Sequence, residues 1–470
     1  MSPVAPEVVL AAKLQELFAK ICEQSDRLSD LPDRQATGQV AAWSVVQEVN
    51  AVAADVAERN RYLRRSLTGR QRRPVSVHWG RALDGDALHY LGVVGVLRSR
   101  RSVPDDLCGQ VMAFLAGPSI PIQRHVVINA NLDLAEPVEV AGWQLWRPTR
   151  EELDSVRPVQ AAMAYAPSSG WDPLLFEGTC SMLSRIDAEA NPRSHVTRLL
   201  PAFIMDEIFG PELSIAAWPP LLLLNLFCDD PVSVVSEYEV EPGRFMEMVR
   251  GERLTTTIIG GPGDEHEIVA FGPFWASGAK LASLLRFLAL LSDHLDGWLP
   301  RRRMAHQKGH PFHRLQRSAQ RLLSLNPCIG YDGTVVFRRR SGEVVLWCVA
   351  ALEHLLTSAG ERDGDLTRRV AQRAAVLVGH DDEHRLQIEE FVKSGYRVRS
   401  LLAHGDAPSD SGTTEALAES MRRLLREAIT RRIVLGPEID IAMSCDRALL
   451  SASERGSVIA APYEQFRAAL

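Results

Sequence analysis

The chain lacks the cysteine patterns that mark a disulfide-stabilised, zinc-binding or redox protein. Its seven cysteines are scattered along 470 residues, and an odd number cannot all be paired in disulfides. No two of them have Cys-x-x-Cys or zinc-site spacing. Some lie in apolar surroundings, as Cys348 does, and such cysteines behave as small buried hydrophobes. The sequence therefore predicts reduced thiols, and we expect no metal and no cofactor.

A secretory leader and a membrane-spanning run are also missing. The N-terminus has no basic start followed by an apolar core. The longest leucine-rich cluster, residues 221–228, is far shorter than the roughly 20 apolar residues that cross a bilayer. These absences favour a protein of the reducing cytoplasm that has no membrane partner.

An excess of positive charge is absent as well. The formal net charge is −6 and the sequence pI is about 6.1, so only a local basic patch could hold a nucleic acid. Residues 301–317 and 338–340 are the two arginine-rich runs that could form one. Solvated surface is the commoner role of such runs. The sequence leaves both roles open.

The length predicts two or three domains. Helical periodicity over residues 5–28 and 38–66 predicts an N-terminal pair of helices that could form a hairpin. Apolar and polar residues alternate over 124–134, 138–146 and 232–240, which predicts strands with one wet face. We therefore divide the chain into a helical hairpin (1–70), a mixed α/β sensing or binding region (71–300), a helical domain (301–440) and a C-terminal tail (441–470).

The segment 396–405 is the most informative for chemistry. Arg399 can grip a phosphate through two donors, and His404 can exchange a proton near neutral pH. Together they could cut RNA without a metal, because imidazole can move the 2′-hydroxyl proton while guanidinium stabilises charge on the phosphate. The same spacing recurs at Arg73 and at Arg301, but there a proline or a solvated basic run surrounds it.

Two further segments precede this motif in a recognisable order. Residues 351–356 read Ala-Leu-Glu-x-Leu-Leu, and Arg373 is followed directly by two alanines. Residues 396–405 then read Tyr-x-x-Arg-Ser-x-x-x-His-Gly. In this order the segments resemble the HEPN superfamily, most closely its Apea-like branch. The resemblance covers residues 311–435, roughly a quarter of the chain.

This resemblance implies an α+β multidomain protein, in which a mixed α/β N-terminal region precedes an all-α HEPN helical bundle. It implies an endoribonuclease with Arg399 and His404 in its active site and Ser400 as their polar neighbour. It also implies a homodimer in which two motifs face one another. Many HEPN proteins are toxins or effectors of antiviral (phage) defence, so a regulatory protein or a phage-derived trigger is expected beside the RNA substrate. A tyrosine found in some HEPN toxins is replaced here by Asp406.

Helical geometry complicates the pairing of the two central residues. Residues five apart on an ideal helix point roughly 140° away from each other. Arg399 and His404 therefore share a face only if the helix ends between them, which Gly405 permits. Arg397, seven residues before His404, lies nearly on its face and is the substitute candidate.

Two more side chains are expected to support the site. Tyr396 belongs to the motif itself. Glu353 lies among apolar residues, and a buried carboxylate needs a partner, so we expect it to pair with Arg373 or Arg399. Direct chemistry by Glu353 is the less favoured alternative.

Two other hypotheses compete with the enzyme. The helical domain could be a non-catalytic HEPN scaffold that binds RNA or a protein partner. The three-segment match could also arise by chance in a structural adaptor.

Overall fold

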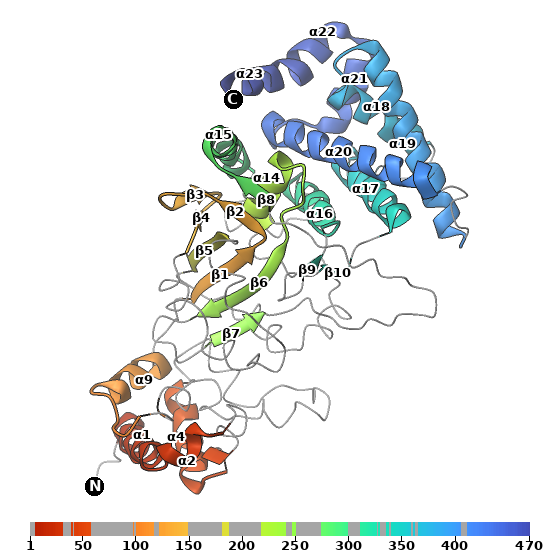
Figure 1. Ribbon diagram of the computed structural model, residues 1–470. Coiled ribbons are helices and arrows are strands. Elements are labelled where there is room, and N and C mark those ends of the chain that lie inside the picture. Colours follow the sequence, from red (N-terminus) through yellow and green to blue (C-terminus); the bar gives the residue numbers. More distant parts are fainter. Residues whose placement is uncertain are drawn as a thin grey trace.

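The computed structural model describes a subset of the 470 residues. The described residues are 5–31, 39–40, 42–57, 97, 100–116, 122–148, 181–187, 218–240, 247–250, 274–298, 311–326, 328–329, 335–337, 340–358, 361, 365–405 and 411–470. Most of the basic run at 301–317 lies outside these residues, as does Asp406. Within them the chain is mostly helical and carries a few small strands, in an α+β arrangement (Figure 1).

The N-terminal helices form a small cluster at one end of the molecule (Figure 1). Helix α1 packs against α4 and α9 through an apolar stripe that includes Leu10, Leu14 and Phe18, all fully buried. The helices of this cluster are α1 (Pro6–Glu23), α2 (Ser25–Ser29), α4 (Ser44–Ala57) and α9 (Leu107–Ala116).

A six-stranded antiparallel sheet occupies the middle of the molecule. Its strand order is β3-β4-β5-β1-β6-β7, so β5 lies between the β3–β4 hairpin and β1. The hairpin turns at Ala141 and Gly142, whose φ values of 48° and 73° suit a tight two-residue turn. The strands are β1 (Ile122–Ile128), β3 (Val138–Val140), β4 (Trp143–Trp146), β5 (Ser181–Asp187), β6 (Val234–Val240) and β7 (Glu247–Arg250).

Two short strand pairs accompany this sheet. Strand β2 (Ala130–Leu132) runs parallel to β8 (Phe274–Ala276), and β9 (Cys328–Ile329) pairs with β10 (Val335–Phe337) in the antiparallel sense.

Helices α14 (Trp218–Phe227) and α15 (Gly278–Asp296) lie between the sheet and the C-terminal helices (Figure 1). The leucine-rich cluster of the sequence forms α14, which is buried from Trp218 to Leu226. A helix that is apolar all round belongs inside a protein core. No helix among the described residues is long and apolar enough to cross a membrane.

From α17 onward, every regular element of the described residues is a helix. Residues after 440 are helical too, and Ile441, Cys445 and Phe466 are buried among the other helices. The elements are α16 (Pro311–Leu323), α17 (Ser341–Leu356), α18 (Leu366–Val378), α19 (Asp382–Ala403), α20 (Ser411–Leu435), α21 (Ile441–Leu450), α22 (Ala452–Glu454), the π-helix η4 (Arg455–Ala460) and α23 (Ala461–Ala469).

Candidate functional site

The Arg–His motif lies at the end of α19, which packs closely against α17 and α20. Gly395 makes the approach possible, because a Cβ there would lie 3.0 Å from Val349 and 3.2 Å from Met421. Near the end of α19, Leu402 lies beside Gly342 in the first turn of α17. The two helices therefore run in opposite directions, and the end of α19 that carries the motif lies along α17.

Three of the predicted site residues come together between these helices. The Arg399 guanidinium forms an ion pair with Glu353 of α17 and lies 5.7 Å from the centre of the Tyr396 ring. Glu353 was expected to pair with Arg373 or Arg399, and Arg399 is the partner. The structure confirms the salt bridge and resolves the alternative.

This cluster is partly buried from solvent. The Glu353 side chain is 17% exposed and that of Arg399 is 37% exposed. The Tyr396 hydroxyl is buried and makes no hydrogen bond of ordinary geometry. Burial raises the pKa of Tyr396 well above its usual range, and the negative charge of Glu353 raises it further. Tyr396 is therefore a neutral packing partner for Arg399.

His404 is placed differently. It caps the end of α19, and its backbone N–H donates to the carbonyls of Ser400 and Leu401. The residue is exposed, and its imidazole makes no hydrogen bond or ion pair with any described residue. Gly405 then leaves the helix at a φ of 84°. The imidazole is thus open to solvent and accessible to a bound molecule.

One chain does not bring Arg399 and His404 together. Helix α19 continues to Ala403, so the five-residue spacing keeps its angle of roughly 140°. The guanidinium leans back over Tyr396 toward the start of the helix, whereas His404 stands at its end. The helix does end between the two residues, but only at Ala403, and His404 keeps a right-handed helical backbone with φ −91°. The end therefore comes too late to turn His404 toward Arg399.

The other two predicted residues lie on the solvent side. Arg397 is exposed and interacts with Ser394 at 3.2 Å and Glu390 at 3.5 Å on its own helix. Ser400 is exposed one turn before His404. Both side chains are exposed and neither contacts Arg399 within the described part of the chain, so they form the rim of the motif.

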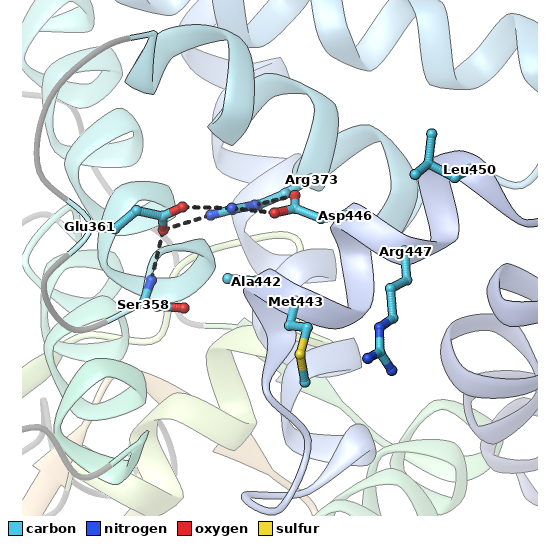
Figure 2. A pocket seen from close by; sticks show the side chains of 8 residues that line it. All are labelled: Ser358, Glu361, Arg373, Ala442, Met443, Asp446, Arg447 and Leu450. Carbon is cyan, nitrogen blue, oxygen red and sulfur yellow. Dashed lines mark hydrogen bonds and ion pairs between the residues drawn. The ribbon is translucent and has the colours of Figure 1, made fainter.

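A second cluster, centred on Arg373, was not predicted from the sequence (Figure 2). Arg373 is only 2% exposed, and all five of its N–H donors are used. It binds both oxygens of Glu361 and both oxygens of Asp446 at 2.7–2.8 Å, and the Leu356 carbonyl at 3.0 Å. The sequence signal for this cluster is the position of Arg373 on the apolar side of a helix, because a buried arginine needs acidic or carbonyl partners.

A pocket of about 340 Å³ opens beside this cluster (Figure 2). The two carboxylates that line it already have hydrogen-bond partners. Arg373 donates to both Glu361 and Asp446, and Glu361 also accepts from Ser358 N at 2.9 Å. This arrangement ties α18 to α21 and leaves little unused hydrogen-bonding capacity. The pocket is lined by Ser358, Glu361, Arg373, Ala442, Met443, Asp446, Arg447 and Leu450.

The described residues contain no group of three or more His, Cys, Asp or Glu side chains arranged to hold a metal ion. Four of the described cysteines are buried free thiols. Burial raises the pKa of Cys348 and of Cys445 to about 12, so these thiols stay protonated and unreactive. They serve as packing residues.

Comparison with known proteins adds no family assignment. No protein-family model, no curated protein and no solved structure matches the chain.

Proposed function

We propose that the chain is a metal-independent endoribonuclease of the HEPN type. The observation that carries this proposal is the exposed imidazole of His404, which ends the same helix that presents Arg399. A partly exposed arginine and an unpaired histidine are the two groups that RNA cleavage without a metal needs. The three-segment resemblance to HEPN proteins supports the same assignment.

In the proposed reaction the RNA supplies its own nucleophile. The 2′-oxygen attacks the adjacent phosphorus while one imidazole accepts the 2′-hydroxyl proton. The new O–P bond forms as the bond to the 5′-oxygen breaks, and a protonated imidazole or water returns a proton to that oxygen. The products are a 2′,3′-cyclic phosphate and a 5′-hydroxyl. Arg399 stabilises the charge that builds on the phosphate oxygens.

The divergence of Arg399 and His404 favours a site built from two copies. In that arrangement His404 of one copy would approach the phosphate held by Arg399 of the other. Helix α19 also exposes apolar side chains that a second copy could cover, with Leu386 at 65%, Phe391 at 43% and Leu401 at 40% exposure.

Glu353 would hold Arg399 in place until RNA arrives. A carboxylate and a phosphate compete for the same guanidinium, so substrate binding would loosen the Glu353–Arg399 pair. The resemblance further suggests a toxin or effector in phage defence, with a regulatory protein or phage-derived trigger that controls the activity.

The first test is cleavage of total RNA by purified protein in EDTA. We expect the wild type to release fragments with cyclic-phosphate ends, and His404→Ala to be at least about 100-fold slower, because it loses its general acid–base group. His404 is exposed, so this change leaves packing intact. Arg423→Ala is the matched control, because Arg423 is an exposed arginine of α20 outside the motif.

Equal cleavage by the wild type and His404→Ala would reject this site. One observation favours a non-catalytic scaffold as the second candidate: Arg399 is already engaged by Glu353 and turned away from His404. A scaffold predicts RNA or partner binding without cleavage by any variant.

A further inference from the structure

Helix α16 carries a row of arginines along one side. Arg314, Arg317 and Arg321 are three and four residues apart, which places them on neighbouring turns of one face. The opposite face buries Phe312, Leu315, Ala319 and Leu322 in the core. The helix therefore shows a sharp division between an apolar side and a basic side.

Helix α17 completes this surface. The two helices are fixed together by Ser318, whose hydroxyl donates to the Ala351 carbonyl at 2.8 Å. The Arg321 guanidinium lies over the Trp347 ring, 4.9 Å from its centre. His354 lies two turns after Trp347 on α17, and the positive charges of the row act on it. We call Arg314, Arg317, Arg321, Trp347 and His354 the arginine stripe.

The charges of all three arginines act on His354. Burial lowers the pKa of His354 to about 4, and the charges of Arg321, Arg317 and Arg314 lower it in that order. The imidazole is thus neutral at physiological pH and leaves the positive field of the stripe to the arginines.

Arg314 and Arg317 form no ion pair with a carboxylate among the described residues. Arg317 is exposed and forms no ion pair with any described residue. Arg314 donates to the carbonyl and hydroxyl of Thr357, which are neutral acceptors. Glu361 lies near Arg314 but is already shared between Arg373 and Arg369. Glu343, an acidic residue, lies one turn before Trp347 in the first turn of α17, next to the stripe.

We propose that the arginine stripe binds the sugar–phosphate backbone of single-stranded RNA. The helical rise spaces the Cα atoms of these arginines by about 4.5 and 6 Å along α16, so their long side chains can reach successive phosphates of an extended strand. Arginine binds phosphate with two donors, and the Arg321 guanidinium with the Trp347 ring beneath it adds a flat surface of the kind on which bases stack. The choice of RNA as the polyanion rests on the proposed function.

The neighbourhood does not suit a membrane surface. The large apolar side chains that are exposed among the described residues lie on other elements and not on α16 or α17. Without an apolar side chain to insert, a bilayer would gain only surface electrostatics. RNA uses both the row of charges and the aromatic ring.

The stripe also lies beside the Arg–His motif. Helix α17 contacts α16 on one side and α19 on the other. His354 of the stripe directly follows Glu353, which holds Arg399. An RNA strand that crosses α17 would therefore pass from the stripe to Arg399, so the stripe would position substrate without taking part in the chemistry.

The test is equilibrium binding of a fluorescein-labelled single-stranded RNA in EDTA, measured by anisotropy over a range of salt concentrations. All proteins in this assay carry His404→Ala, so that cleavage does not interfere. Arg317→Glu is compared with Arg101→Glu, which makes the same charge change at an exposed arginine near α9. Circular dichroism melts check that both variants fold.

We expect Arg317→Glu to weaken binding at least tenfold at low salt and to flatten the slope of log Kd against log salt by about 1. Arg101→Glu should change neither. Equal losses in the two variants, no loss in either, or no RNA binding at all would overturn the stripe. Anionic vesicles or a poly-glutamate peptide that bind through Arg317 in place of RNA would overturn it too.

The binding and cleavage assays test the stripe and the nuclease independently of each other. Stripe-dependent binding without any cleavage by the chain that retains His404 would reject the nuclease and keep the stripe. Cleavage that is unaffected by Arg317→Glu, even at low RNA concentration, would keep the nuclease and reject the stripe.

Discussion

A buried arginine shows how a single residue can determine the packing of its surroundings. Arg373 cannot lose its proton in a protein, so each of its donors must find an acceptor inside the core. Glu361 and Asp446 provide four of these acceptors from segments that are 12 and 73 residues away in sequence. The sequence shows an arginine on an apolar face, but it does not show which distant carboxylates reach it.

Glu361→Gln tests this cluster. Its hydrogen bonds with Arg373 are the largest cause that lowers the pKa of Glu361 to about 2 from an ordinary 4.5. The stabilisation is therefore present above pH 4.5 and is lost as the pH falls toward 2. We expect a loss of about 2–3 kcal/mol in unfolding free energy at pH 7, with the gap to wild type closing between pH 4.5 and 2.

Urea unfolding at several pH values measures the effect of Glu361→Gln. Glu419→Gln is the control, because Glu419 is exposed and its 3.8 Å pair with Arg423 should contribute less than about 1 kcal/mol. A gap that stays constant down to pH 2 would show that Glu361 acts through shape and not through charge.

At the scale of elements, the periodicity of apolar residues predicted helices and strands, but it did not predict where a strand turns or where two helices approach closely. Apolar spacing over residues 5–28 predicted a helix, and α1 (Pro6–Glu23) with α2 (Ser25–Ser29) occupies that range. The alternating segment 138–146 is instead a hairpin, β3 and β4, because Ala141 and Gly142 turn the chain. Ala-Gly is a weaker turn signal than Asn-Gly or Asp-Gly.

Gly395→Val tests the close approach of α19 to α17 and α20. Its Cβ would lie 3.0 Å from Val349 and 3.2 Å from Met421, both fully buried. Overpacking of this kind costs about 1–3 kcal/mol. Gly456→Val is the control, since no atom lies within 4 Å of a Cβ there and both changes add the same β-branched side chain to a helical position.

Thermal melts of the two variants give the comparison. We expect Gly395→Val to melt clearly below Gly456→Val and to bring Arg399 out of register with Glu353. Similar melting temperatures would mean that the three helices can separate without cost, and that the glycine does not position the motif.

At the scale of the whole molecule, one core joins the sheet to the C-terminal helices. Its buried apolar residues run from Val126 in β1 to Phe466 in α23. Polar groups reinforce the junction: Asn225 of α14 bonds to the backbone of Val232, and Asn326 bridges Asn225 to Arg422 of α20. The buried residues of α1 belong to a different cluster of the described chain.

This division predicts two units of unfolding, namely the N-terminal helices alone and the sheet together with the C-terminal helices. Asn225→Ala would leave the N–H of Val232 and the carbonyl of Leu221 without their buried partner, at a cost of at least about 2 kcal/mol. The slowest-exchanging amides of β1 and of α18 should then both exchange about thirty-fold faster, because they open in the same event.

Hydrogen exchange with mass spectrometry resolves the two units by peptide. Leu14→Ala, at a fully buried position of α1, is the reciprocal variant and should accelerate exchange in α1 and α4 alone. If Asn225→Ala speeds exchange in β1 and leaves α18 unchanged, the sheet and the helices are separate units. A ligand bound to the sheet could then stabilise the helices that carry Arg399 only through a new contact. If both speed up together, any stabilisation of the sheet is transmitted to the motif by the shared core.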